Sequence, residues 1–148
     1  MAQGGPAISG AFGHDGGRGS YQLQSGLELL GGLPEGAGRQ EQELELSIAL
    51  GPALIATKGY SALHVQETIG RARALAEQLN RIIYLVPLLF SQWMFHIARA
   101  EHRRALSVAE EIEKVGAARS DAALVSLSNS SRGWTLFNLG DFVAACIL

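Results

Sequence analysis

The sequence predicts an all-α fold built from antiparallel helical hairpins that stack as a short solenoid. From Tyr21 onward, apolar residues recur every three or four positions, which is the spacing of one face of a helix. No segment alternates apolar and polar residues for long enough to predict a strand. Turn signals centred near Lys58, Ala100 and Gly140 fall at nearly equal intervals, and this spacing indicates an internal repeat of helical hairpins, roughly 40 residues long.

Residues 1–20 differ from the rest of the chain because they are rich in glycine and poor in apolar side chains. Ordering glycine costs much backbone entropy, and little apolar burial offsets that cost here. We expect residues 1–20 to be a flexible leader and residues 21–148 to form one tetratricopeptide-like helical-repeat domain. The segment 13–20 lacks the Lys-Ser/Thr pair that ends a phosphate-binding loop, so we do not predict such a loop.

The domain begins with two helical segments. The first has an apolar face and ends at Leu33-Pro34, since proline disrupts a helix. The second runs over residues 38–57, and Gly51-Pro52 predicts an interruption or kink within it. The apolar faces are Leu23, Leu27 and Leu30 in the first segment and Leu44, Ile48 and Ile55 in the second.

The middle of the chain predicts three more helices. A turn at residues 58–61 contains Gly59 and Tyr60, and Ser61 is the expected cap of the following helix. Glu67 and Arg71 are expected to pair on the exposed side of that helix. The apolar stripes of the three helices are Val65, Ile69, Ala72, Ala76 and Leu79; Ile82, Val86, Leu89, Trp93 and Ile97; and Ala105, Ala109 and Ile112.

The last hairpin carries the most informative residues. Gly140 is expected to close one helix in the left-handed conformation, and Asp141 to cap the next. Phe142 is expected to wedge between the two helices, while small residues allow them to approach closely. The residues that define the repeat are Gly59, Tyr60, Trp93, Ala105, Gly133, Trp134, Leu136, Gly140, Phe142 and Ala145.

The two tryptophans, Trp93 and Trp134, lie about one repeat apart and occupy similar places in their helices. We expect both to be core residues, and we expect Leu127 to be buried as well. The alternative is that the tryptophans line a concave groove and hold a partner peptide.

Composition argues against several classes of function. The net charge is −2 and the aromatic residues are not interleaved with basic ones, so no nucleic-acid partner is predicted. The longest apolar run, residues 82–90, contains Pro87 and follows Arg81, so we expect a buried helix and no membrane partner. Cys146 is the single cysteine, which excludes an internal disulfide and fits a cytoplasmic protein.

No catalytic residue, cofactor site or metal site is predicted, and we expect no enzyme. The histidines at positions 14, 64, 96 and 102 lack the spacing of a zinc helix. The acidic residues at 41, 43, 45, 110, 111 and 113 are expected to lie on solvated helix faces. A small metal- or thiol-dependent enzyme using His96 or Cys146 stays open as an alternative.

Several segments carry a resemblance to a known family. They are Gly26-Leu-Glu-Leu-Leu30, Leu50-Gly-Pro-Ala-Leu-Ile-Ala-Thr-Lys-Gly-Tyr60, Ala72-Arg-Ala-Leu-Ala-Glu-Gln-Leu79 and the run from Gly133 to Phe142. From Tyr21 onward the chain resembles the helical-repeat region of bacterial multidomain regulators that carry a class III adenylate/guanylate cyclase domain and an AAA-type ATPase domain.

The resemblance implies a non-catalytic interaction or sensory module in signal transduction, which binds a protein segment, a neighbouring domain or a ligand. Neither catalytic domain is present in this sequence, so cyclase or ATPase activity is carried over to no residue. We expect the chain to be a fragment truncated at its C-terminus. The alternative is a self-associating structural fragment, a homo-oligomer formed through an uncapped C-terminal helix that exposes Phe142, Ile147 and Leu148.

Overall fold

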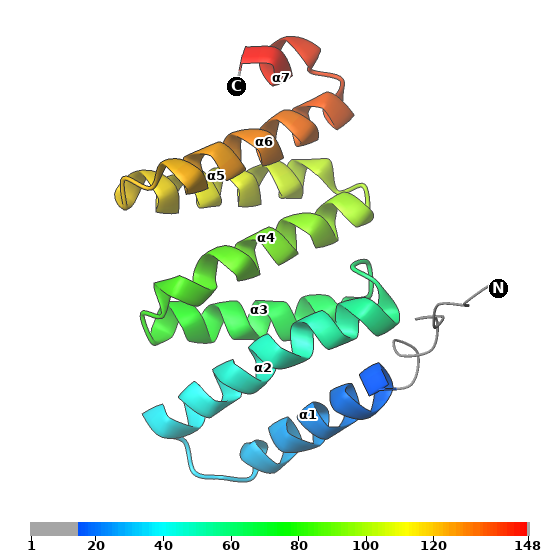
Figure 1. The fold of residues 1–148 in the computed structure, drawn as a ribbon, viewed down its shortest axis with the longest axis vertical. Coiled ribbons are helices and arrows are strands. Elements are labelled where there is room, and N and C mark those ends of the chain that lie inside the picture. Colours follow the sequence, from blue (N-terminus) through cyan, green and yellow to red (C-terminus); the bar gives the residue numbers. More distant parts are fainter. Residues whose placement is uncertain (1–14, 148) are drawn as a thin grey trace, which may run out of the picture.

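The computed structural model describes residues 15–147 and confirms the all-α class, since these residues form seven helices and no strand. The helices are α1 (Asp15–Gly31), α2 (Ala37–Lys58), α3 (Leu63–Gln78), α4 (Ile82–Ala98), α5 (His102–Ala118), α6 (Ala122–Leu139) and α7 (Phe142–Ile147). Each helix packs against its neighbours in sequence. The stack therefore runs from α1 at one end to α7 at the other, with α3 and α5 behind α2, α4 and α6 (Figure 1).

The predicted boundary of the N-terminal leader is wrong. Residues 15–20 belong to α1, while residues 1–14 lie outside the described part of the chain. Ser20 is buried, and Leu23 and Leu27 pack against the first hydrophobic cluster. Packing of α1 against α2 therefore outweighs the poor helix propensity of the glycines at its start.

Four of the turns share one backbone geometry at regular intervals. Their residues with positive φ are Asn80 (53°), Ala100 (56°), Ser120 (53°) and Gly140 (82°), and the interval along the chain is constant. At each turn the next residue donates its amide hydrogen to a carbonyl five positions back, with N···O distances of 2.8–3.0 Å. This is the Schellman motif, and it makes each helix-plus-turn unit from α4 to α6 the same length.

Helices α3 and α5, which are two helix-plus-turn units apart along the chain, bury residues at corresponding positions. Val65, Ile69, Ala72 and Ala76 of α3 correspond, one repeat later, to Ala105, Ala109, Ile112 and Gly116 of α5, and all eight are buried. The same face of each helix therefore packs into the stack. The length of the predicted internal repeat agrees with this correspondence.

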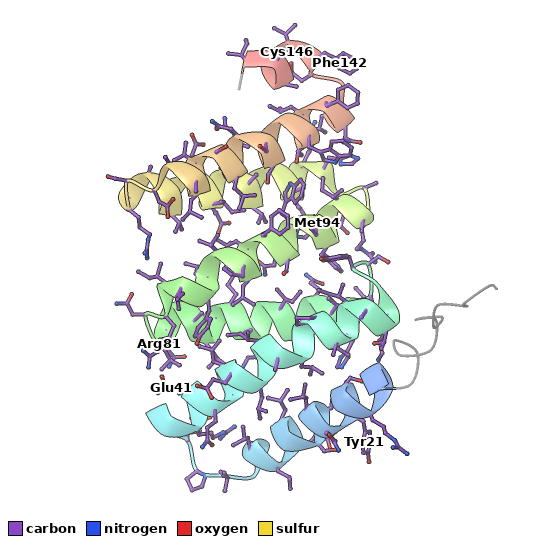
Figure 2. The ribbon with its side chains drawn as sticks, in the orientation of Figure 1. Tyr21, Glu41, Arg81, Met94, Phe142 and Cys146 are labelled. Carbon is purple, nitrogen blue, oxygen red and sulfur yellow. The ribbon has the colours of Figure 1, made fainter. Side chains whose placement is uncertain are left out.

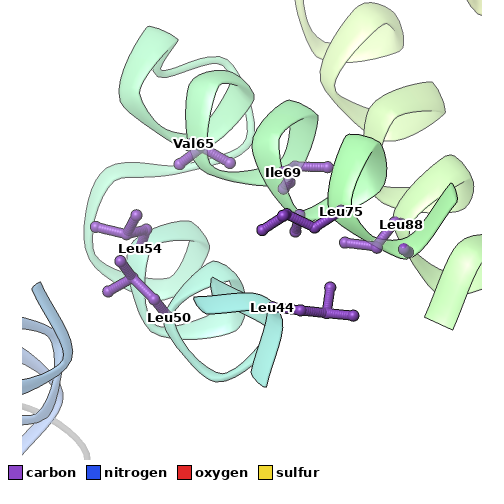
Figure 3. Close-up of a cluster of buried hydrophobic side chains, with 9 residues drawn as sticks. Leu44, Leu50, Leu54, Val65, Ile69, Leu75 and Leu88 are labelled. Carbon is purple, nitrogen blue, oxygen red and sulfur yellow. The ribbon is translucent and has the colours of Figure 1, made fainter. Parts of the chain in front are cut away.

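Two hydrophobic clusters follow one another along the stack. The first joins α2, α3 and the start of α4, and its leucines Leu44, Leu50 and Leu54 face Ile69 and Leu75 across the α2–α3 interface (Figure 3). The second joins α4 and α5, and Leu127 of α6 packs on it partly buried. Both clusters are built from helices adjacent in sequence.

Glycine sets the closest approach between α5 and α6. A Cβ atom added at Gly116 would lie 2.9 Å from the Leu124 Cβ and 3.0 Å from the Val125 nitrogen. These distances are shorter than van der Waals contact, so a larger residue at this position requires the helices to move apart.

Two local expectations are wrong and one is confirmed. Helix α2 continues through Pro52 to Lys58, so Gly51-Pro52 does not interrupt the helix, while the kink expected there stays a prediction. Ser61 is not the cap of α3, because the residue directly before this helix is Ala62, which makes no side-chain cap hydrogen bond. Asp141 does cap α7, because its Oδ1 accepts a hydrogen bond of 3.1 Å from the Ala144 amide.

Candidate functional site

The described residues contain an apolar groove between α2 and α4, with α3 as its floor. Its volume is about 160 Å³. The lining residues are Ser47, Ile48, Gly51, Pro52 and Ile55 from α2, Ile69 from α3, and Tyr84, Pro87, Leu88 and Ser91 from α4. Among the described residues, no charged side chain lines this groove.

The sequence of α2 explains why the groove is open. Gly51 is buried but has no side chain, and a Cβ atom there would lie 4.0 Å from the nearest atom of Ile69. Pro52 and Pro87 are exposed on the two rims, each inside its own helix. Small and rigid side chains on facing helices therefore leave an apolar depression in the surface.

The hydroxyl of Ser91 is already satisfied within its own helix, because it donates to the Pro87 carbonyl at 2.9 Å. At one end of the groove's flanking helices, an ion pair joins Glu41 of α2 to Arg81 at the start of α4 (Figure 2). The groove therefore offers apolar contact and few free donors, and a bound segment would be recognised mainly by an apolar side chain.

The corresponding space between α4 and α6 is closed. The Trp93 Nε1 donates to the Thr135 Oγ1 at 3.0 Å, and the Thr135 hydroxyl donates to the Ser131 carbonyl at 2.7 Å. Ser128 also donates to the Ala109 carbonyl at 3.1 Å. A large side chain and buried hydroxyl groups thus fill the gap that stays open between α2 and α4.

The repeat-defining residues lie in the core, in two turns and on the last two helices. Trp93 and Ala105 belong to the second core cluster, as predicted. Gly59 and Tyr60 form the α2–α3 turn, and Gly140 forms the α6–α7 turn. The remaining ones are Gly133, Trp134 and Leu136 on α6 and Phe142 and Ala145 on α7.

The prediction that Trp134 is a core residue is wrong, because 56% of its surface is exposed. Phe142 is also exposed and does not wedge between the helices. Its ring packs edge-on against the ring of Phe137 at the surface, with 5.3 Å between the ring centroids. The short helix α7 contacts α6 without covering these aromatic rings. The close approach of the two helices is present, since a Cβ at Gly133 would lie 3.6 Å from the Ala145 carbonyl oxygen.

The acidic residues are less solvated than predicted, because several pair with arginines of neighbouring helices. Glu43 accepts two hydrogen bonds from Arg71, at 2.6 and 3.1 Å, so the predicted Glu67–Arg71 pair is not formed. This bidentate hydrogen bonding lowers the pKa of the Glu43 carboxyl. Two further interhelical pairs are Arg73–Glu111 and Arg132–Glu113.

The candidate catalytic and metal-binding residues are dispersed. In the described part of the chain, no three His, Cys, Asp or Glu side chains are grouped as a metal site. His96 is hydrogen-bonded to Glu101 at 2.7 Å across the α4–α5 turn, and His64 to Gln24 at 2.8 Å. Cys146 is exposed on α7 (Figure 2), while His14 lies outside the described residues.

Sequence reasoning missed the α2–α4 groove as a site. Pro52 indicated only an interruption or kink of its helix and Pro87 argued only against a membrane span, although Gly51 beside Pro52 signals a place where helix α2 has little side-chain bulk. The signal that could have revealed the groove is therefore a proline inside each of two helical segments, α2 and α4, which come before and after a third helix in the sequence.

Comparisons with protein-family models, curated proteins and solved structures found no match. Among residues 15–147, none of the helices combines the length and apolar character needed to cross a bilayer.

Proposed function

We propose that the chain is a non-catalytic, tetratricopeptide-like helical-repeat module that binds a protein segment in the groove between α2 and α4. The observation that carries this proposal is an open apolar groove on a stack of helices joined by turns of constant spacing. Repeat stacks of this kind present extended surfaces to partners. The partner would be an extended segment that places one apolar side chain over Ile69 between Pro52 and Pro87.

The cellular context is part of the same proposal. The sequence resemblance to bacterial cyclase–ATPase regulators supports a role as an interaction or sensory arm in a cytoplasmic signalling protein, next to catalytic domains that this sequence does not contain. Within residues 15–147, the dispersed histidines and the exposed Cys146 offer no convergent reactive groups. They therefore favour binding over a metal- or thiol-dependent reaction.

The test is a selection of peptides from a random displayed library on the immobilised protein, followed by fluorescence anisotropy with the selected peptides. Ser91→Phe places a ring in the groove and should weaken binding at least about tenfold, the effect of losing a good apolar contact. Ser107→Phe is the matched control, because Ser107 is exposed on α5 and also donates to the carbonyl four positions back.

Selected peptides that bind both variants equally would refute the groove as the site. A thermal melt of each variant establishes that the fold is retained. If Ser91→Phe does not fold, Ile48→Ser removes an apolar wall of the same groove and replaces it in the comparison.

A second candidate function is self-association through α7. Val143 and Ile147 are 75% and 78% exposed, and Phe142 is exposed beside them, while Leu148 lies outside the described residues. Exposed apolar patches favour association. Light scattering that gives only the monomer mass at micromolar concentration would refute this candidate.

A further inference from the structure

A second depression lies on the other side of the stack, between α1 and α3, with α2 as its floor. Its volume is about 270 Å³. Unlike the α2–α4 groove, it combines charged and apolar walls. The lining residues are Leu27, Leu30 and Gly31 from α1, Arg39, Glu43 and Ser47 from α2, and His64, Glu67, Thr68 and Arg71 from α3.

Side chains cross the gap between α1 and α3 beside this depression. Gln24 of α1 is hydrogen-bonded to His64 of α3 at 2.8 Å. Gly31 has no side chain to cross the gap, and a Cβ added there would have no neighbour within 4 Å. The depression is therefore an open space bounded by a hydrogen bond between the two helices.

The two arginines that line this depression, Arg39 and Arg71, differ in their hydrogen-bond and ion-pair partners. Arg71 forms an ion pair with Glu43, which accepts two hydrogen bonds from it. Arg39 donates only to the Leu33 carbonyl, at 2.9 Å, and its buried Nε has no hydrogen-bond partner. Within the described residues, no carboxylate lies within ion-pair distance of Arg39.

The equivalent gap between α3 and α5 shows how such an arginine is satisfied elsewhere in the chain. There, Arg73 of α3 donates to Glu111 of α5 and to Gln92 of α4, and it also pairs with Glu77. A carboxylate thus closes the α3–α5 gap.

Glu43 and Glu67 also line the α1–α3 depression, but Glu43 is hydrogen-bonded to Arg71 and Glu67 lies 3.7 Å from His64. Arg39 helps to lower the pKa of Glu43 through its charge, yet among the described residues it forms no ion pair with either carboxylate.

We propose that the α1–α3 depression binds a compact organic anion, whose oxyanion group accepts hydrogen bonds from the Arg39 guanidinium. A short hydrocarbon part of the same ligand would lie against Leu27 and Leu30. Arginine recognises carboxylate and phosphate oxygens through its paired donors, and mixed apolar and polar walls are typical of small-molecule sites. This proposal is independent of the α2–α4 groove.

Bound ligand would contact three helices at once and would hold α1 against α3. A ligand that binds only the folded state stabilises it, so binding should raise the thermal midpoint. It should also slow amide hydrogen exchange in α1 more than in α5, which is remote from the depression.

The experiment is calorimetric titration with three probes: butyrate, inorganic phosphate and n-butanol. Butyrate combines an oxyanion with a hydrocarbon and should bind saturably, while n-butanol lacks the charge and should not. Phosphate that binds more tightly than butyrate identifies the oxyanion as a phosphate group. Arg39→Gln should weaken butyrate binding about tenfold or more, the effect of losing a hydrogen bond to a charged group.

Arg119→Gln is the matched control, because Arg119 is exposed at the end of α5 and forms no ion pair with a described residue. If Arg39→Gln does not fold, Arg39→Lys replaces it, because this variant keeps the positive charge but removes the paired donors of the guanidinium. Absence of saturable binding to both anions, or equal affinity in the Arg39→Gln and Arg119→Gln variants, would overturn the proposal. The Ser91→Phe variant should retain anion binding, which separates this site from the peptide groove.

Discussion

Helices α4 and α6 occupy equivalent places in the stack, yet the faces that they turn toward the following helices differ. Both end in a Schellman turn, at Ala100 and Gly140. The α4 face is large and apolar, whereas the α6 face is small or polar and lines an open depression of about 460 Å³. Leu85, Leu89, Phe90 and Trp93 on α4 correspond, one repeat later, to Val125, Asn129, Ser130 and Gly133 on α6.

The difference between the two helices separates two determinants of this fold. Turn geometry sets the length and direction of each helix, because the same hydrogen bonds recur at each of the four turns. Side-chain size sets whether the space between helices is filled, since backbone spacing alone leaves voids that large residues must occupy. Surfaces open to a partner arise where small residues replace large ones.

The two tryptophans should give the largest contrast. Trp93 is 8% exposed in the second cluster and bonded to Thr135, whereas Trp134 is 56% exposed. We expect Trp93→Ala to lower the free energy of unfolding by about 3–5 kcal/mol through loss of buried contacts. Trp134→Ala should change it by about 0.5 kcal/mol or less, as for a surface substitution.

Urea denaturation of both variants measures this contrast. Equal losses of stability would show that α6 buries its tryptophan as α4 does, and the comparison between the helices would fail. The expectation that both tryptophans are core residues follows from treating their spacing of about one repeat as structural equivalence. Trp134 corresponds instead to Met94, one position further along the helix than Trp93.

Sequence predicted the periodic parts of the molecule well. The helical spacing of Val65, Ile69 and Ala72 and the turn at Gly140 depend on local patterns, and these patterns are present in the structure. The start of α1 and the exposure of Trp134 depend on which helix lies opposite. A single sequence without its contacts does not specify that arrangement.

The candidate sites were less predictable for the same reason. The α2–α4 groove needs Gly51 and Pro87 on two different helices. The α1–α3 depression needs Arg39 to have no ion-pair partner among the described residues of the three helices that line it. Each residue is ordinary in its own segment. Only the packing of nonadjacent helices around a shared floor brings them together.

The next largest effect is expected where α5 meets α6. Gly116→Ala should lower the free energy of unfolding by about 1–3 kcal/mol, because the new methyl group would overlap Leu124 and the Val125 backbone. Gly70→Ala is the control, since a Cβ there has no neighbour within 4 Å. It should raise stability by about 0.5–1 kcal/mol through helix propensity. Thermal unfolding of the two variants should therefore shift in opposite directions.

A smaller effect is expected from exchanging the residues of two equivalent turns. Ala100 adopts positive φ at a cost that glycine avoids, so Ala100→Gly should stabilise the protein by about 0.5–1 kcal/mol. Gly140→Ala should destabilise it by about 1–2 kcal/mol, the cost of an L-residue in that region. Urea midpoints that shift in the same direction would show that the two turns are not equivalent.

The smallest effect is a change in acid sensitivity at the α4–α5 turn, where Glu101 corresponds to Asp141 of the α6–α7 turn. Hydrogen bonds from His96 and then Arg99 lower the pKa of Glu101 from 4.5 to about 2. A pKa lowered by folding adds stability that is complete above the unfolded value and is lost as pH falls toward the folded one. The wild type should therefore lose stability between pH 4.5 and pH 2 more steeply than Glu101→Gln.

The matched variant is Asp141→Asn, which retains an oxygen able to cap α7. Its slope of urea midpoint against pH should stay close to that of the wild type over the same interval, because the pairing of His96 with Glu101 is intact. If Glu101→Gln keeps the wild-type slope, the His96–Glu101–Arg99 cluster does not stabilise the folded state. The chemical difference between the α4–α5 and α6–α7 turns would then have no thermodynamic consequence, and backbone geometry alone would account for both.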